Sequence, residues 1–423
     1  MTLEVSGILS GNVQVPPSKS VAHRMLICAA LANEPCSIVC RSVNRDMEAT
    51  AACLNALGAD IIYTDGRFNV TPIRNLRKGQ LLDCGESGST LRFLLPVAAA
   101  LGADAVFTGQ GRLPERPLSP LYEEMTAHGI RMSENGRMPI SCHGILPPGN
   151  YTIDGGVSSQ FISGLLMALS VPGAESTVTV TGKTESASYI ELTVNALSRF
   201  GIEVQRTADG YRIPGGQEYS TPSSRIPVEG DWSAAAFWIV AGVAGCKSIS
   251  CTGLDYYSSA QGDRRIVDVL RGMGADIITG KDFITAMPSG LTASHIDCSD
   301  IPDLVPVMAV AAASAQGTTV FHNIRRLRIK ESDRVRSILE MLSATGISAY
   351  ATDNTLTVTG GLAHNASYNP SGDHRMAMAA AVLASVRNVN MAIADAECTA
   401  KSYPGFFDDF SALGGETKRI DNG

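Results

Sequence analysis

A regularly repeated glycine constrains the fold of this chain more than any other feature of its sequence. Five times an amphipathic helical pattern ends in glycine and continues as an apolar, strand-like run, and successive glycines are 71, 72, 73 and 72 positions apart. Glycine suits the end of a helix, where the chain turns through a left-handed conformation. The pattern predicts a chain built of tandem repeats. The five glycines are Gly58, Gly129, Gly201, Gly274 and Gly346.

A second kind of predicted helix alternates with the amphipathic one and is apolar on nearly all sides. Such helices belong in the interior of a domain. Short polar residues of the kind that cap helices precede each of them, and their starts recur every 69 to 73 residues. The six predicted buried helices span residues 21–31, 90–101, 161–169, 234–244, 304–313 and 375–384.

These patterns make six α/β units of about 70 residues in a chain of 423. We predict an α/β fold of two domains, each containing three similar units around buried helices, that is, an inside-out α/β barrel. The last unit is incomplete, because only eight residues follow Gly414-Gly415, while residues 3–8 and 12–15 read as unassigned strands. The N-terminal strands should therefore complete the second domain. The expected domains are residues 17–226 and residues 1–16 plus 227–423.

Composition limits the partners of the protein. The chain is 44% hydrophobic and 18% charged with a net charge of −7, which argues against a general nucleic-acid or anionic-membrane surface. Its apolar runs are shorter than the ~18 residues of a membrane-spanning helix, and no signal sequence is recognisable, so we expect a cytoplasmic protein. The ten cysteines include no CxxC pair, which favours reduced thiols and no metal site.

Charged residues nevertheless gather at the predicted helix starts. Unpaired backbone N–H groups and the helix dipole make such positions natural anion sites. We therefore predict an electropositive surface suited to small phosphate or carboxylate ligands, whereas no glycine loop typical of nucleotide binding is present. The cations are Lys19, Arg24, Arg92, Arg116, Lys330, Arg334, Arg375 and Lys401, and the carboxylates among them are Glu86, Asp231, Asp303, Glu331 and Asp373.

Four segments of this chain, taken in order, resemble the 5-enolpyruvylshikimate-3-phosphate synthase family. They are PSKS at 17–20 followed by Arg24, GESGSTLR at 85–92, KESDR at 330–334 and DHRMAM at 373–378. The resemblance spans the whole chain. It implies two domains of three similar units that close over shikimate 3-phosphate and phosphoenolpyruvate, with the active site in the interdomain cleft, in a monomer without metal or organic cofactor.

The resemblance also implies a reaction and its catalysts. The family transfers the enolpyruvyl group of phosphoenolpyruvate to the 5-hydroxyl of shikimate 3-phosphate and releases phosphate, within aromatic amino acid biosynthesis. By resemblance, Asp303 is the base for the 5-hydroxyl, Glu331 exchanges a proton at the methylene carbon, and Lys19 is a partner in that step. Because neighbouring cations stabilise an ionised Glu331, its acid role needs burial or substrate charge to raise its pKa.

Two sets of binding residues carry over by the same resemblance. The expected shikimate 3-phosphate contacts are Lys19, Ser20, Arg24, Ser158, Ser159, Gln160, Ser186, Tyr189, Asp303 and Lys330. The expected phosphoenolpyruvate contacts are Lys19, Gly88, Arg92, Arg116, Gln160, Arg334, Arg375 and Lys401. Gly88 leaves room beside phosphoenolpyruvate, which makes glyphosate an expected inhibitor. Arg326 stands where the family often has Asn, so no role is carried over to it.

Asp231 and His374 lie close to these residues in the sequence, and two other functions are compatible with parts of the pattern. We interpret Asp231 as a helix cap and His374 as structural. One alternative function is a UDP-N-acetylglucosamine enolpyruvyl transferase, which typically carries a reactive cysteine in a mobile loop; neither Cys84 nor Cys142 has a fitting context. The other is a non-catalytic, repeat-built anion-binding protein, which would leave Asp303 and Glu331 among the cations unexplained.

Overall fold

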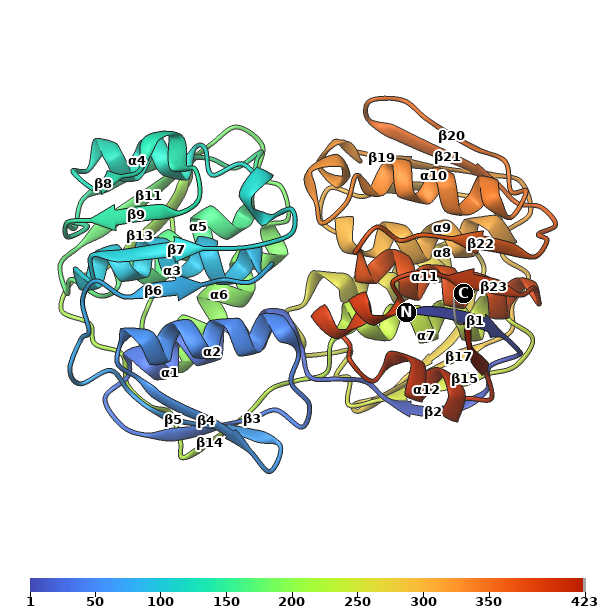
Figure 1. Cartoon of the computed structure of the whole chain (residues 1–423), viewed down its shortest axis with the longest axis horizontal. Coiled ribbons are helices and arrows are strands. Elements are labelled where there is room, and N and C mark those ends of the chain that lie inside the picture. The colour runs from blue at the N-terminus through green and yellow to red at the C-terminus, as the bar shows by residue number, and fades with distance from the viewer. Residues whose placement is uncertain (421–423) are drawn as a thin grey trace. The chain divides into compact units, whose positions relative to one another are not determined.

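The computed structural model describes residues 1–420, which form two compact units (Figure 1). The N-unit is Pro17–Val228, and the C-unit is Met1–Pro16 together with the chain from Glu229 onward. The division falls two residues beyond the expected one. Val228 still belongs to the N-unit because its N–H donates to the carbonyl of Val39 at 3.1 Å, whereas Gly230 bonds to Gly253 of the C-unit at 3.0 Å.

Each unit contains three four-stranded sheets of one design, so the predicted six α/β units are confirmed. In every sheet the first strand is parallel to the second, and the other two are antiparallel to their neighbours. The N-unit sheets are β14 (Arg225–Pro227), β3 (Cys36–Val39), β5 (Arg67–Thr71) and β4 (Asp60–Thr64); β6 (Leu81–Asp83), β7 (Ala105–Thr108), β9 (Ile140–His143) and β8 (Arg131–Met132); and β10 (Asn150–Asp154), β11 (Ser176–Thr181), β13 (Gly210–Ile213) and β12 (Gln205–Arg206).

The C-unit repeats this design with strands from both ends of the chain. Its sheets are β2 (Gly11–Gln14), β15 (Ile249–Thr252), β17 (Phe283–Met287) and β16 (Asp276–Thr279); β18 (His295–Asp297), β19 (Thr318–His322), β21 (Thr355–Thr359) and β20 (Ala349–Ala351); and β22 (Ala366–Tyr368), β23 (Met391–Ile393), β1 (Thr2–Ser6) and β24 (Glu416–Ile420). In the last sheet β1 lies between β23 and β24, antiparallel to both. It fills the position that β21 holds in the sheet before it.

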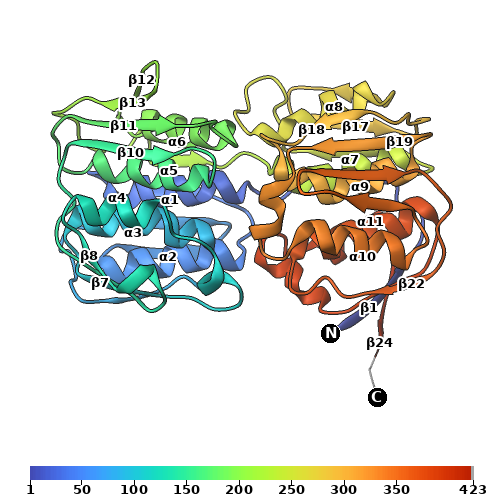
Figure 2. The same ribbon diagram turned by 90° about the horizontal axis from the view of Figure 1, so that it is seen from above.

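Six apolar helices lie inside the units, and their burial explains their composition. They are α1 (Lys19–Leu31), α3 (Gly88–Leu101) and α5 (Ser159–Leu169) in the N-unit, and α7 (Trp232–Ala244), α9 (Val305–Ser314) and α11 (His374–Arg387) in the C-unit. Within the C-unit, α7, α9 and α11 pack on one another, and Figure 2 shows them among the sheets of that unit. In the N-unit α3 packs directly on α5.

The amphipathic helices bury one face, expose the other, and end as the glycines predict. They are α2 (Arg45–Leu57), α4 (Leu121–Ala127), α6 (Ala187–Arg199), α8 (Ile266–Gly272), α10 (Arg334–Ala344) and α12 (Phe406–Ala412). All five predicted glycines have positive φ, from 81° at Gly201 to 115° at Gly58, and Gly414 after α12 has a φ of 98°. The left-handed turn at each helix end is therefore confirmed.

Several predicted absences can be compared with the described residues. No helix among them is long and apolar enough to cross a membrane. Within residues 1–420, no three His, Cys, Asp or Glu side chains are grouped so that they could hold a metal ion. All ten cysteines are free thiols, and only Cys246 of them is exposed.

Candidate active site

The first helix of the N-unit presents a lysine at its start. Ser18 caps α1, since its hydroxyl accepts from the N–H of Val21. Lys19, the first residue of the helix, donates from Nζ to Oδ2 of Asp46 at 2.9 Å, and both side chains are largely buried. Asp46 lies in the first turn of α2, and its carbonyl accepts from Oγ1 of Thr90 in α3 at 3.4 Å. The starts of three helices of the N-unit are thus joined through Asp46.

A second group of contacts joins α3 to α5. Arg92 of α3 donates from Nη1 to Oε1 of Gln160 at 2.8 Å, and Nε2 of Gln160 donates to Oγ of Ser89 at 2.9 Å. Arg92 also donates from Nη2 to the carbonyl of Pro117 at 3.0 Å. Since Pro117 follows Arg116, Arg92 fixes the backbone beside that second arginine. The structure therefore brings together Arg92, Gln160 and the backbone next to Arg116, three of the positions that the sequence assigned to phosphoenolpyruvate.

Gly88, the first residue of α3, lies against Arg116. A Cβ atom at Gly88 would meet Nη1 of Arg116 at 2.7 Å and Cζ at 3.0 Å, closer than real Cβ contacts occur. The absence of a side chain at this position therefore allows the guanidinium group of Arg116 to approach the start of the helix.

Arg24 is a buried link between three helices. Its Nε donates to Oγ1 of Thr193 at 2.7 Å, and Nη2 donates to the carbonyl of Tyr189 at 2.8 Å, both in α6. Nη1 donates to the carbonyl of Ser20 at 2.7 Å, and Nη2 reaches Oγ of Ser163 in α5 at 3.4 Å. Burial lowers the pKa of the guanidinium group to about 10. Arg24 therefore orients α1, α5 and α6 in addition to any contact with a ligand.

Ser20, one of the four serines predicted to bind substrate, lies in the first turn of α1, and the other three lie at the starts of α5 and α6. Ser158 caps α5, and its neighbour Ser159 is 4% exposed. Ser186 precedes α6 with a left-handed φ of 55° and does not cap that helix. Non-glycine residues in this conformation are uncommon and are found at sites that position a ligand or a turn.

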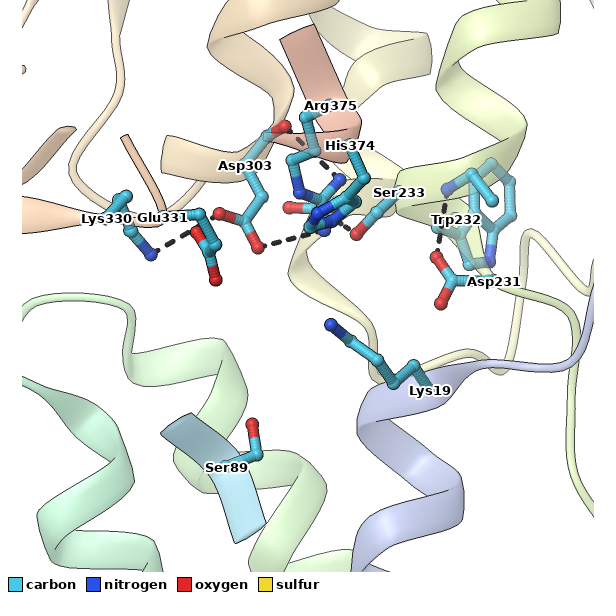
Figure 3. Close-up of polar contacts among 12 residues, drawn as sticks. Lys19, Ser89, Asp231, Trp232, Ser233, Asp303, Lys330, Glu331, His374 and Arg375 are labelled. Carbon is cyan, nitrogen blue, oxygen red and sulfur yellow. Dashed lines mark hydrogen bonds and ion pairs between the residues drawn. The ribbon is translucent and has the colours of Figure 1, made fainter. Parts of the chain in front are cut away.

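The C-unit holds a second cluster, centred on the carboxylate of Asp303 (Figure 3). Arg334 donates from Nη1 to Oδ1 of Asp303 at 2.8 Å, and Lys330 approaches the same oxygen at 3.3 Å. Arg375 donates from Nη2 to Oδ2 at 3.0 Å. Asp303 lies in the short 3-10 turn η4 (Pro302–Leu304), and no side chain caps the helix α9 that follows. Its carboxylate therefore forms ion pairs with the cations and does not cap α9.

Two further carboxylates balance this cluster. Arg334, which is 1% exposed, also donates to Oε2 of Glu331 at 2.7 Å and to Oδ2 of Asp373 at 2.8 Å. Asp373 accepts from Ser332 at 3.0 Å and caps α11 through the N–H of Arg375. Three carboxylates thus alternate with three cations. The cluster is closer to charge balance than the electropositive surface expected from the sequence.

The charges of the cluster shift one another's pKa values. Burial alone would raise the pKa of the Asp303 carboxyl, but Arg375, Lys330 and Arg334 together hold it well below its ordinary value of 3.8. Burial lowers the pKa of the Lys330 ammonium group to about 8, although Asp303 opposes this shift. The C-unit therefore carries an ionised carboxylate next to a lysine that titrates close to neutral pH.

The remaining residues of the C-unit that the sequence singled out lie at helix ends. Oδ1 of Asp231 accepts from the N–H of Ala234 at 2.9 Å and so caps α7, as predicted. His374 begins α11 and is 1% exposed. Lys401, 7% exposed, ends the short helix η6 (Ala396–Lys401), which packs against α11.

Sequence reasoning gave no role to several residues that hold these clusters. Asp46 reads as an ordinary acidic residue in the first turn of a helix, where a carboxylate is expected in any case. Asp373 stands in the DHRMAM segment and is fully buried, which an N-cap assignment alone does not suggest. Asp263 lies in the 3-10 helix η3 (Gly262–Arg265) and is 2% exposed. No local pattern marks these residues, because their partners lie in other elements.

Comparison with known proteins agrees with the geometry. Residues 3–410 match the family described as EPSP synthase (3-phosphoshikimate 1-carboxyvinyltransferase). A protein of that second name from Clostridium kluyveri is 42% identical over 420 residues, covering 96% of each chain, and one from Clostridium botulinum is 37% identical over 422 residues, covering 97% of this chain and 96% of its own. The solved EPSP synthase of Acinetobacter baumannii has a TM-score of 0.81 at 24% identity, covering 99% of this chain and 100% of that one.

A family match over nearly the whole length of both chains defines the class of protein: an α/β enolpyruvyl transferase of two three-unit domains. The chain belongs to the EPSP synthase (3-phosphoshikimate 1-carboxyvinyltransferase) family. The resemblance and the fold class predicted from the sequence are therefore confirmed.

Proposed function

We propose that this protein transfers the enolpyruvyl group of phosphoenolpyruvate to the 5-hydroxyl of shikimate 3-phosphate, giving 5-enolpyruvylshikimate 3-phosphate and phosphate. The observation that carries the proposal is the Asp303 cluster, in which one carboxylate lies between Lys330, Arg334 and Arg375. A reaction between two anionic substrates needs cations that bind them and a base that takes a hydroxyl proton, and the cluster supplies both.

Asp303 is the proposed base, and we propose that its low pKa rises when the substrates bind. In the protein without ligand, the three cations make this carboxylate a weak base. The same cations are the proposed partners of the substrate anions, Lys330 for shikimate 3-phosphate, and Arg334 and Arg375 for phosphoenolpyruvate. Negative charge brought by the substrates opposes the pull of the cations, so the basicity of Asp303 rises when both substrates are present.

Glu331 is the proposed proton donor and acceptor at the methylene carbon, and Lys19 of the N-unit is proposed to take part in the same step. Glu331 is held by Arg334 at 2.7 Å, so its position is fixed before substrate binds. As Asp303 removes the proton of the 5-hydroxyl, the oxygen attacks C2 of phosphoenolpyruvate while the methylene carbon is protonated. Elimination of phosphate then removes a proton from that carbon, which requires a reusable acid and base.

The N-unit supplies the other proposed contacts. We assign Lys19, Ser20, Arg24, Ser158, Ser159, Gln160, Ser186 and Tyr189 to shikimate 3-phosphate, and Lys19, Gly88, Arg92, Arg116 and Gln160 to phosphoenolpyruvate, with Lys401 of the C-unit added to the second set. Hydroxyl groups and backbone N–H groups at the starts of α1, α3 and α5 suit phosphate oxygens. Two arginines beside Gly88 suit a small dianion.

We further propose that the protein acts in the cytoplasm as a monomer, on small-molecule substrates and without nucleic acid, membrane, metal or cofactor. The net charge of −7 supports the exclusion of polyanionic polymers. Glyphosate is the proposed inhibitor, competing with phosphoenolpyruvate.

The function is tested by phosphate release. The protein should release phosphate from phosphoenolpyruvate when shikimate 3-phosphate is added, and none when UDP-N-acetylglucosamine replaces it. Release with the sugar nucleotide alone would assign the chain to the other enolpyruvyl transfer. If the protein bound both substrates but released no phosphate, only the alternative of a non-catalytic anion-binding protein would remain.

A further inference from the structure

A buried turn in the C-unit is fixed to the start of α7. Gln261 is 6% exposed, and its Nε2 donates to the carbonyl of Gly230 at 2.8 Å. Its Oε1 accepts from the N–H of Trp232, the first residue of α7, at 3.2 Å. An amide side chain that bonds to backbone on both sides of the helix cap holds the turn in one position. The turn continues into the 3-10 helix η3 (Gly262–Arg265).

Asp263 is the carboxylate that this turn places in the interior. It is 2% exposed and accepts a hydrogen bond from Oγ of Ser233, in the first turn of α7. Two residues further on, Arg265 pairs with Asp300 at 3.6 Å, three positions before Asp303. The turn therefore connects the start of α7 to the segment that carries the proposed base.

Two members of the Asp303 cluster act on the pKa of Asp263. Burial raises its pKa to about 7, with Asp303 acting in the same direction and Arg375 in the opposite one. Asp231 at the start of α7 also raises this pKa.

We propose that Asp263 is a positioning residue for the proposed base Asp303, an inference that rests on the proposed function. It holds η3 against the start of α7 through Ser233, and η3 pairs through Arg265 with Asp300, three positions before Asp303. The negative charge of Asp263 also offsets part of the effect of Arg375 on Asp303.

The charge state of Asp263 then affects Asp303. The groups that act on it come from three elements: Asp231 at the start of α7, Asp303 in η4 and Arg375 in α11. The arginines of its own turn are engaged elsewhere, Arg264 with the carbonyl of Tyr256 at 2.6 Å and Arg265 with Asp300. Above about pH 7 Asp263 is ionised and opposes the cations that weaken Asp303; below it, this opposition is lost. Activity should therefore fall as the pH drops through 7.

The test compares Asp263→Asn with Asp268→Asn. Asparagine keeps the size of Asp263 and can still accept from Ser233, but it removes the charge. Asp268 is an exposed carboxylate five residues away, bonded to the hydroxyl of Tyr256 at 2.8 Å, so its variant is a matched control for charge. We expect Asp263→Asn to lower kcat about tenfold with little change in KM, and to remove the acidic limb near pH 7 from the pH profile of kcat/KM. Asp268→Asn should match the wild type in both.

Other outcomes separate this inference from the proposed function. A folded Asp263→Asn protein with wild-type kcat and pH profile overturns the positioning role, as does a loss of thermal stability with the profile unchanged. If that variant does not fold, Ser233→Ala decides: losing its hydrogen bond should move the acidic limb to higher pH, because this bond lowers the pKa of Asp263. An unmoved limb contradicts the proposal. The base assignment itself is tested on Asp303 and can fail independently.

Discussion

At the scale of single residues, the three cations around Asp303 differ in how many carboxylates each of them pairs with. In the C-unit, Arg334 pairs with three carboxylates and is 1% exposed, so phosphoenolpyruvate must compete with these carboxylates for its guanidinium group. Lys330 and Arg375 each have Asp303 as a partner and can change partner when a substrate anion arrives. The chemistry of Asp303 therefore depends on which of its neighbours are occupied.

Gly88→Ala tests the approach of Arg116 to the start of α3. The new Cβ would lie 2.7 Å from Nη1 of Arg116, so the flexible guanidinium group must move while the fold is kept. We expect KM for phosphoenolpyruvate to rise about tenfold or more, and inhibition by glyphosate to weaken as well. Steady-state kinetics measure both, with shikimate 3-phosphate binding as the control. An unchanged KM would remove Gly88 and Arg116 from the phosphoenolpyruvate site.

Lys330 should limit activity at alkaline pH. Because burial lowers its pKa to about 8, Lys330 loses its charge above this pH and with it the attraction for the substrate phosphate. We expect kcat/KM for shikimate 3-phosphate to fall about tenfold for each pH unit above 8. Lys330→Arg, which stays charged, should remove this decline. A decline that persists in the variant would show that another group titrates there.

At the scale of elements, the buried helices explain why the polar clusters form where they do. Their sides are covered by apolar neighbours, so the functional groups collect at their starts. Side chains cap α1, α3, α5, α7 and α11, whereas α9 has no such cap and begins after the turn that carries Asp303. Among the six buried helices, the one without a side-chain cap is thus the one preceded by the proposed base.

Close packing of α3 on α5 can be tested at Gly164. A Cβ there would meet the carbonyl oxygen of Arg92 at 2.3 Å and Cγ of Pro96 at 3.0 Å, and a backbone oxygen cannot move aside cheaply. Gly164→Ala should therefore lower the free energy of unfolding by about 1–3 kcal/mol and disturb Arg92. Gly272 in α8 has open space around it, so Gly272→Ala should be neutral or stabilising by up to about 1 kcal/mol. Denaturant unfolding measures both. Equal effects of the two variants would contradict this packing argument.

At the scale of the whole molecule, the last strand before each passage between units pairs with a strand that is distant in sequence. β2 precedes α1 of the N-unit but pairs in parallel with β15 of the C-unit. β14 precedes α7 of the C-unit but pairs in parallel with β3 of the N-unit. β1, at the start of the chain, is a central strand of the last sheet. Each unit therefore depends on segments that are distant in sequence.

Val5→Ala tests the role of β1 in the C-unit. Val5 is fully buried and pairs with Met391 in β23 and Thr417 in β24. Removing two methyl groups should cost about 2 kcal/mol of unfolding free energy. Hydrogen exchange should become faster in β23 and β24, with the sheets of the N-unit unaffected. Glu4→Ala, on the other face of the same strand, is the control and should change little; faster exchange only in the N-unit would refute the strand assignment.

The six repeated units can be predicted from the sequence, but the contacts between their helices and strands cannot. Glycine spacing and all-round apolar helices predict six units, because both signals are local. The pairing of β14 with β3 could not be predicted, since a strand of three residues that ends in Pro227 shows no alternation of apolar and polar residues. The bonds of Lys19 with Asp46 and of Ser233 with Asp263 depend on how separate elements pack together. The catalytic assignments came from motif resemblance, which names residues without their partners.

The most direct test of the central claim is the turnover of Asp303→Asn, measured as phosphate release and compared with Asp333→Asn. Asp333 lies in the KESDR segment and caps α10, a role that asparagine fills equally well, so this control should keep wild-type turnover. We predict that Asp303→Asn loses about 10²- to 10⁴-fold in turnover while it still binds shikimate 3-phosphate. Wild-type turnover in Asp303→Asn would contradict the assignment of Asp303 as the base.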